Sequence, residues 1–144
     1  MNGKIRIIAG QWRGRKLQVP DKPGLRPTPN RVRETLFNWL MPYIHETNCL
    51  DCFAGAGSLG FEALSRGAKK VTLIELNKAA AKQLLANKQL IKSNDMVIAN
   101  TDVLAFLKAP AADKFDLVLP EVMRENQIDI LEKDSTCSGT FQIF

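Results

Sequence analysis

Residues 50–60 constrain the fold of this chain more than any other stretch. They read LDCFAGAGSLG, an apolar run that ends in Asp51, closely spaced glycines, and the start of an amphipathic segment. Gly55 and Gly57 are positions where a side chain would block a tight turn or the approach of a ligand, and Gly60 allows a helix to pack closely on the preceding strand. The pattern predicts a strand, a turn and a helix whose backbone comes close to a ligand.

The chain after Cys49 alternates between short apolar runs and segments with helical periodicity. We expect strands at residues 50–53, 70–75, 96–99 and 115–119, and helices at residues 58–66, 78–90 and 103–108. Gly67 should end the first of these helices and Asn77 should cap the second, which is expected to bury Ala81, Leu84 and Leu85. Strands separated by helices predict an α/β fold, a parallel sheet with right-handed crossovers and helices on both faces.

The first 48 residues follow a different pattern. Residues 5–10 and 15–20 predict a β-hairpin that turns at residues 11–14, and residues 21–29 contain three prolines, which excludes regular structure. We therefore divide the chain into an N-terminal segment at 1–48, a core at 49–119 and an atypical tail at 120–144.

A helix is expected in the N-terminal segment at residues 31–41. Asn30 is a suitable N-cap, and Pro42 is expected to end the helix. Helical spacing predicts a core-facing side made of Val32, Leu36, Trp39 and Leu40, with Phe37 at its flank.

Positive charge is concentrated in this N-terminal segment. It contains nine Lys/Arg and three acidic residues, a net charge of +6, whereas the remaining 96 residues contain 11 basic and 12 acidic residues, a net charge of −1. A localised basic segment indicates a polyanionic partner such as RNA, and Trp12 adds a stacking surface, although a solvated basic face is the alternative. The candidate RNA-binding residues are Arg13, Arg15, Lys16, Arg26, Arg31 and Arg33.

The sequence indicates neither a membrane span nor an export signal. No apolar run approaches the roughly 20 residues that a spanning helix needs, and the N-terminus lacks a signal-peptide core, so we expect a cytoplasmic protein. Cys49 and Cys52 form a C-x-x-C, but no second ligand pair accompanies it. We interpret both as buried strand residues rather than a zinc or redox site, and predict no metal.

Three acidic residues follow the expected strands. Asp51, Glu75 and Asp102 should lie at the carboxyl edge of the sheet, where ligands bind in open parallel sheets. Glu75, 20 residues after Gly55, suits two ribose hydroxyls, and Asp102 suits an adenine amine or, alternatively, a helix cap. Asp51 suits an ammonium group or the support of the glycine loop.

Residues 55–60 also match G-x-G-x-x-G, so a nicotinamide enzyme is an alternative. In that class the helix start receives a pyrophosphate. A carboxylate four residues before the first glycine would oppose a phosphate, but it suits the amino group and sulfonium of S-adenosylmethionine. We therefore favour a methyl donor.

Two motifs identify a family resemblance: RPTPNRVRETLFNWL at residues 26–40 and DCFAGAGSLG at residues 51–60. They resemble the bacterial RsmD-type 16S ribosomal RNA (guanine-N2)-methyltransferases, over about residues 5–119. The resemblance implies a Rossmann-like methyltransferase fold after an N-terminal hairpin, S-adenosylmethionine as donor, and a guanine amine of small-subunit RNA as acceptor. It implies a donor site formed by Asp51, Phe53, Ala54, Gly55, Gly57, Glu75, Asp102 and Val103.

The resemblance ends within the fourth expected strand. The family continues there into an acidic residue, two prolines and an aromatic residue, which orient the guanine N2 and stack on the extruded base. This chain reads LPEV at residues 119–122. We therefore assign no catalytic residue and hypothesise a truncated or frameshifted member whose fourth strand has an unpaired edge, which sequencing of the encoding DNA would test. A non-catalytic fragment that binds the donor or RNA is the alternative, and we expect a monomer.

Overall fold

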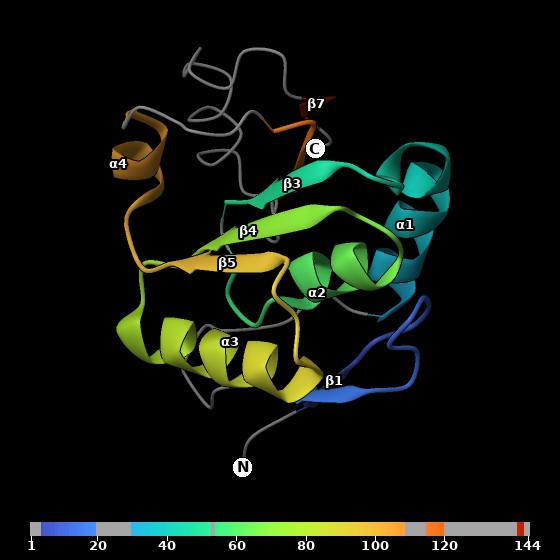
Figure 1. Ribbon diagram of the computed structural model, residues 1–144, viewed down its shortest axis with the longest axis horizontal. Helices are drawn as coiled ribbons and strands as arrows, with labels where there is room; N and C mark the ends of the chain where they lie inside the picture. The colour runs from blue at the N-terminus through green and yellow to red at the C-terminus, as the bar shows by residue number, and fades with distance from the viewer. Residues whose placement is uncertain (1–3, 20–29, 53, 109–114, 120–140, 143–144) are drawn as a thin grey trace.

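A computed structural model describes residues 4–19, 30–52, 54–108, 115–119 and 141–142, and its centre is a five-stranded parallel sheet (Figure 1). The strands are β3 (Asn48–Asp51), β4 (Lys70–Ile74), β5 (Met96–Ala99), β6 (Leu117–Leu119) and β7 (Phe141–Gln142), in the order β5-β4-β3-β6-β7. The connecting helices are α2 (Ser58–Ser65), α3 (Lys78–Ile91) and α4 (Val103–Lys108). The predicted α/β fold is confirmed.

Successive side chains of the strands enter two separate cores, one on each face of the sheet. Cys49 and Leu73 pack into the larger core with Leu59 and Leu84 of α2 and α3. The neighbouring strand residues Leu50, Ile74 and Val118 face the other side of the sheet and form a smaller core. Val103 and Leu107 of α4 pack into this smaller core. Alternation with a period of two therefore leaves helices on both faces, as predicted.

The N-terminal hairpin packs into the larger core. Strands β1 (Lys4–Arg6) and β2 (Lys16–Gln18) pair antiparallel, which confirms the predicted hairpin. The apolar side chains of the hairpin pack in the larger core together with residues of α1 and α2. These hairpin residues are Ile5, Ile7, Leu17 and Val19. The buried Asn87 of α3 also accepts from the N–H of Gln18 at 3.3 Å and donates to its carbonyl at 2.9 Å. The N-terminal segment and the sheet are thus joined by one continuous interior.

Helix α1 (Asn30–Ile44) differs from its prediction in two respects. It continues through Pro42, because a proline in the last turn removes a single backbone hydrogen bond and leaves the preceding turns intact. Its buried side is only partly as predicted: Leu40 is buried and Leu36 packs against the core, but Val32 and Trp39 are 54% and 62% exposed. The buried residues are Arg33, Phe37, Leu40 and Ile44.

Two predictions about helix ends are confirmed, and two other local predictions are wrong. Asn77 caps α3 by accepting from the N–H of Ala80 at 2.9 Å, and Gly67 follows α2 with a φ of 116°. Leu85, expected in the core, is 44% exposed. Strand β6 does not end the sheet, because β7 pairs with it in parallel. None of the helices in the described part of the chain is long and apolar enough to cross a membrane.

Candidate functional site

The loop between β3 and α2 lies where the strand order reverses. Strand β3 has β4 on one side and β6 on the other, so its carboxyl end is the switch point at which open parallel sheets bind ligands. The loop is tied to the end of β4, since the N–H of Ala54 donates to the carbonyl of Ile74 at 3.0 Å. It closes on itself through the N–H of Gly57, which donates to the carbonyl of Ala54 at 2.7 Å.

Two glycines at the start of α2, Gly57 and Gly60, are required by the protein's own packing. Gly55 and Gly57 have φ values of 54° and 81°, in the left-handed region. A Cβ on Gly57 would lie 2.6 Å from Cδ2 of Leu84, and one on Gly60 would lie 2.1 Å from Cδ2 of Leu73. The tight approach of α2 and α3 to the sheet therefore depends on these positions.

Glu75 links the loop to the next strand. Its Oε1 accepts from the N–H of Gly55 at 2.8 Å, and its Oε2 accepts from the N–H of Asn77 at 2.7 Å. The side chain is half-buried at the carboxyl end of β4, and the amide of Asn100 donates to its backbone carbonyl at 2.8 Å. Each carboxylate oxygen has two lone pairs, so both keep accepting capacity toward a ligand.

The other predicted donor residues have different surroundings. Asp102 is exposed and accepts from the N–H of Ala105 at 3.2 Å, so it caps α4, while Val103 is buried in the smaller core. Asp51 is fully buried, and a Cβ on Gly60 would lie 3.4 Å from its Oδ2. Asp51 therefore lies beneath the loop and against α2. Phe53 is outside the described residues.

The C-x-x-C cysteines are both buried in and after β3. Burial raises the pKa of the Cys49 thiol to about 11, although a hydrogen bond with Thr47 lowers it. A thiol held in its neutral form is a poor metal ligand and a poor nucleophile. Within the part of the chain that is described, no group of three or more His, Cys, Asp or Glu could hold a metal ion.

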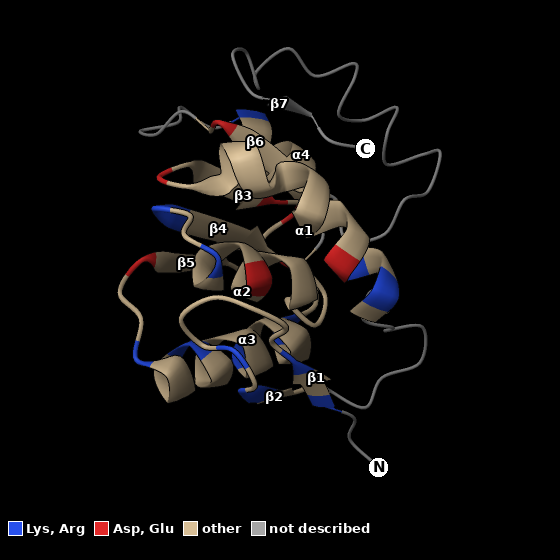
Figure 2. Ribbon diagram, turned by 90° about the vertical axis from the view of Figure 1, so that its right-hand side faces the viewer, with Lys and Arg blue, Asp and Glu red and all other residues tan. Residues whose placement is uncertain are grey.

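The predicted RNA-binding residues differ in how far their side chains are exposed to solvent. Lys and Arg gather on the hairpin and near the start of α1 (Figure 2), where Arg13, Lys16 and Arg31 are exposed. Arg15 is also exposed and donates to the carbonyl of Leu90 at 3.0 Å. Arg26 is outside the described residues.

The prediction that Arg33 contacts RNA is wrong, because its side chain is fully buried. Its guanidinium donates to the carbonyl of Arg6 at 2.7 Å and to Oδ1 of Asn30, and it lies 3.6 Å from Oε1 of Glu62. An arginine in the interior needs a carboxylate nearby, and Glu62 provides it. Arg33 therefore joins α1 to the hairpin and to α2.

Glu62 is the residue that sequence reasoning missed. It is fully buried in α2 and accepts from the N–H groups of Ile8 and Ala9 at 2.9 and 3.1 Å. Arg66, one helical turn later, donates to it at 2.7 Å. The one signal in the sequence is a single charged residue in the otherwise uncharged helix SLGFEALS.

The parallel sheet with its switch-point loop defines a class of fold, that of the Rossmann-like methyltransferases. A solved structure described as a putative methyltransferase from Escherichia coli is similar with a TM-score of 0.77 and 46% identity, over 92% of this chain and 74% of that chain. A putative methylase from Haemophilus influenzae has a TM-score of 0.75 and 49% identity, over 96% and 76%.

The chain belongs to the family described as conserved hypothetical protein 95, which matches residues 5–132, further than the expected limit near Leu119. The ribosomal RNA small subunit methyltransferase D of Haemophilus influenzae is 60% identical over 81% of this chain, and that of Escherichia coli strain K12 is 58% identical over 74%. The RsmD-type resemblance is confirmed. This chain spans 62% and 54% of the lengths of these two relatives.

Proposed function

We propose that this chain binds S-adenosylmethionine at the loop between β3 and α2 and methylates the N2 amine of a guanine in 16S ribosomal RNA. The observation that carries the proposal is the hydrogen bond from Gly55 to Glu75, which joins the glycine loop to a strand-end carboxylate at the switch point. The relatives named ribosomal RNA small subunit methyltransferase D support the choice of substrate. The proposal includes a monomer that meets the small subunit in the cytoplasm.

The described residues fit the donor. Glu75 keeps lone pairs for the ribose hydroxyls, and exposed Asp102 keeps one carboxylate oxygen for the adenine amine after it has capped α4. Asp51, buried beneath the loop, and Gly57 within it would hold the loop in shape, and the buried Val103 would support the start of α4 from the smaller core. When bound, the donor supplies an electrophilic methyl group on its sulfonium.

The hairpin and the exposed start of α1 would hold the RNA. Arg13, Arg15, Lys16 and Arg31 carry charge on that side of the molecule, and phosphates of the RNA are the anions that suit it. No catalytic residue is assigned, because residues 120–140 are outside the described part of the chain.

A second candidate function is a non-catalytic protein that binds the donor or RNA. It is favoured by the LPEV sequence at residues 119–122, which replaces the acidic residue, prolines and aromatic residue of the family.

Two measurements on the full chain separate the candidates. Calorimetry with S-adenosylmethionine tests the donor site, and transfer of a labelled methyl group to small-subunit RNA that lacks the modification tests the reaction. Binding with transfer supports the enzyme, and binding without transfer supports the second candidate. Absence of donor binding by the folded protein would contradict the assigned loop.

A further inference from the structure

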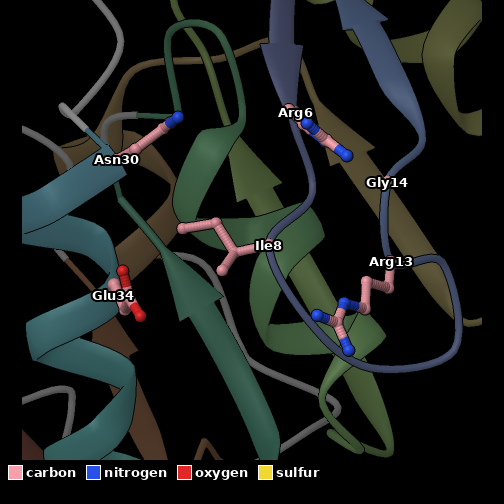
Figure 3. Close-up of a pocket in the computed structure, with 6 residues that line it drawn as sticks. All are labelled: Arg6, Ile8, Arg13, Gly14, Asn30 and Glu34. Carbon is pink, nitrogen blue, oxygen red and sulfur yellow. The ribbon is translucent and has the colours of Figure 1, made fainter.

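A pocket with two arginines and a glutamate among its lining residues lies between the hairpin and α1 (Figure 3). Its volume is about 260 Å³, below the roughly 300 to 1,000 Å³ of pockets for drug-sized ligands. Arg6, Arg13 and Gly14 line it from the hairpin, Asn30 and Glu34 line it from α1, and Ile8 lies between the two sides. A pocket of this size suits a small unit such as one nucleotide.

The charged groups of this pocket are available to a ligand. Arg6, Arg13 and Glu34 are exposed, and among the described residues none of the three side chains forms an ion pair. Two guanidinium groups favour an anion, and arginine binds phosphate with two parallel hydrogen bonds.

The walls of the pocket are held from behind by the buried cluster of Arg33 and Glu62. Arg33 donates to the carbonyl of Arg6 and to the side chain of Asn30, which both line the pocket. Glu62 accepts from the N–H of Ile8 at 2.9 Å. These bonds fix the hairpin against α1 before any ligand arrives, which lowers the entropy lost on binding.

The turn of the hairpin leaves the pocket open. Gly14 has a φ of 84°, and an added Cβ would meet nothing closer than the Arg6 guanidinium at 3.9 Å. Its N–H donates to the carbonyl of Ile7 at 2.8 Å, and the N–H of Arg13 donates to the carbonyl of Gly10 at 3.2 Å. Backbone hydrogen bonds therefore hold the turn in shape, and the absence of a side chain at Gly14 leaves room in the pocket.

We propose that this pocket binds one nucleotide of an RNA strand. The backbone phosphate lies between Arg6 and Arg13, the sugar packs on Ile8, and the 2′-hydroxyl donates to the Glu34 carboxylate. A carboxylate would repel a second phosphate but accepts from a hydroxyl, and the 2′-hydroxyl is the group by which a protein distinguishes RNA from DNA. The inference rests on the RNA substrate of the proposed function and names a discrete contact for it.

The test of the phosphate contact is the binding of a fluorescent RNA oligonucleotide of mixed sequence, about 12 nucleotides long, to the full chain. Arg6→Ala and Arg13→Ala should each weaken binding about fivefold to tenfold and lower the salt dependence by about 0.7 per lost phosphate contact. Lys82→Ala, which removes an exposed charge from α3, is the control and should change affinity less than twofold. An equal effect of all three variants would overturn the pocket and indicate diffuse charge attraction.

Glu34→Ala tests the sugar contact by the ratio of RNA to DNA affinity. Loss of a repulsive charge raises both affinities alike, so the ratio is unaffected by it. The proposal expects the preference for RNA over the same DNA sequence to fall severalfold in Glu34→Ala and to persist in Lys82→Ala. An unchanged ratio in Glu34→Ala would overturn the assignment of the 2′-hydroxyl.

Binding is measured without the methyl donor, so this proposal and the proposed function fail separately. If the wild type transfers methyl groups and the arginine variants bind RNA as the wild type does, the proposal about the pocket is contradicted and the proposed function stands. If the arginine variants selectively lose RNA binding and the wild type transfers no methyl group, the proposal about the pocket is supported. The proposed enzymatic function is then contradicted.

Discussion

Glu62 and Glu75 make similar local bonds in different regions of the molecule. Each carboxylate accepts from two backbone N–H groups, Glu62 from the hairpin and Glu75 from the glycine loop and the start of α3. Glu62 is fully buried and also contacts Arg33 and Arg66, whereas Glu75 is half-buried at a strand end.

The difference separates a structural carboxylate from one that can serve a ligand. Burial of Glu62 is tolerable because the surrounding guanidinium and N–H groups replace water, so little capacity remains for another partner. Glu75 keeps access to solvent, so a ligand hydroxyl can take the place of water on it. We therefore expect substitutions in the first region to change stability and those in the second to change binding.

Glu62→Gln should have the largest effect on stability. It leaves Arg33 buried without its nearby negative charge, which costs about 3 to 5 kcal/mol in the free energy of unfolding. Urea denaturation measures the loss. Glu34→Gln, on the exposed side of α1, is the matched control and should stay within about 0.5 kcal/mol of wild type. A similar small change in both variants would contradict the role of the buried cluster.

Gly10→Ala and Gly14→Ala form a matched pair in the hairpin turn. Both glycines have a φ in the left-handed region, but a Cβ on Gly10 would lie 2.0 Å from the carbonyl oxygen of Ser65, whereas one on Gly14 would make only an ordinary contact with the Arg6 guanidinium at 3.9 Å. Gly10→Ala should cost about 3 kcal/mol, from strain and overpacking together, and Gly14→Ala about 1 kcal/mol from strain alone. Thermal and urea unfolding measure both. Equal losses would show that the hairpin is not held tightly against α2.

Cys49 is a buried acidic group near the carboxylates Asp116 and Asp51, whereas Glu62 is buried beside two arginines. Burial, together with the nearby Asp116 and Asp51, raises the pKa of Cys49 from 9.0 to about 11, so the folded state keeps its proton at a pH where the unfolded chain loses it. Its contribution to stability is present below pH 9 and lost as the pH rises toward 11. Relative to Cys49→Ala, the wild type should lose up to about 3 kcal/mol across this window. Parallel pH profiles of unfolding would contradict this.

Glu75→Gln should change binding more than stability. We expect affinity for S-adenosylmethionine to fall about tenfold, or about 1.4 kcal/mol, and the free energy of unfolding to change by about 1 kcal/mol or less. Calorimetry and urea denaturation measure the two quantities on the same sample. Glu46→Gln, an exposed residue before β3, should change neither. A loss of stability as large as that of Glu62→Gln would remove the contrast between the two carboxylates.

Local signals predicted most of the sheet and its helices. Residues 96–99 and 103–108 have the predicted bounds, and Asn77 caps its helix as expected. These features depend on neighbours within a few residues, through strand alternation, helical spacing and capping. The acidic residues at the strand ends were found in the same way, because strand order places carboxyl ends at one edge.

The buried side of α1 was not predictable from local signals. Val32 and Trp39 are apolar and fit a helical stripe, while Arg33 carries a charge and was assigned to the surface. The buried stripe keeps Leu40 from the predicted side but contains Arg33 and Phe37 in place of Val32 and Trp39. It becomes stable only when Glu62, 29 residues later, lies close enough to compensate the guanidinium.

The sequence by itself determined the parallel α/β arrangement, the glycine loop with its following carboxylate, and the basic character of the N-terminal segment. The tertiary structure alone decided which charged side chains are buried and which remain exposed to solvent. The reason is physical: strand and helix patterns are properties of neighbouring residues, whereas the burial of a charge depends on a counter-charge brought from elsewhere in the chain. Arg33 and Arg13 look alike in the sequence, and only folding separates them into a buried side chain that supports the hairpin and an exposed one.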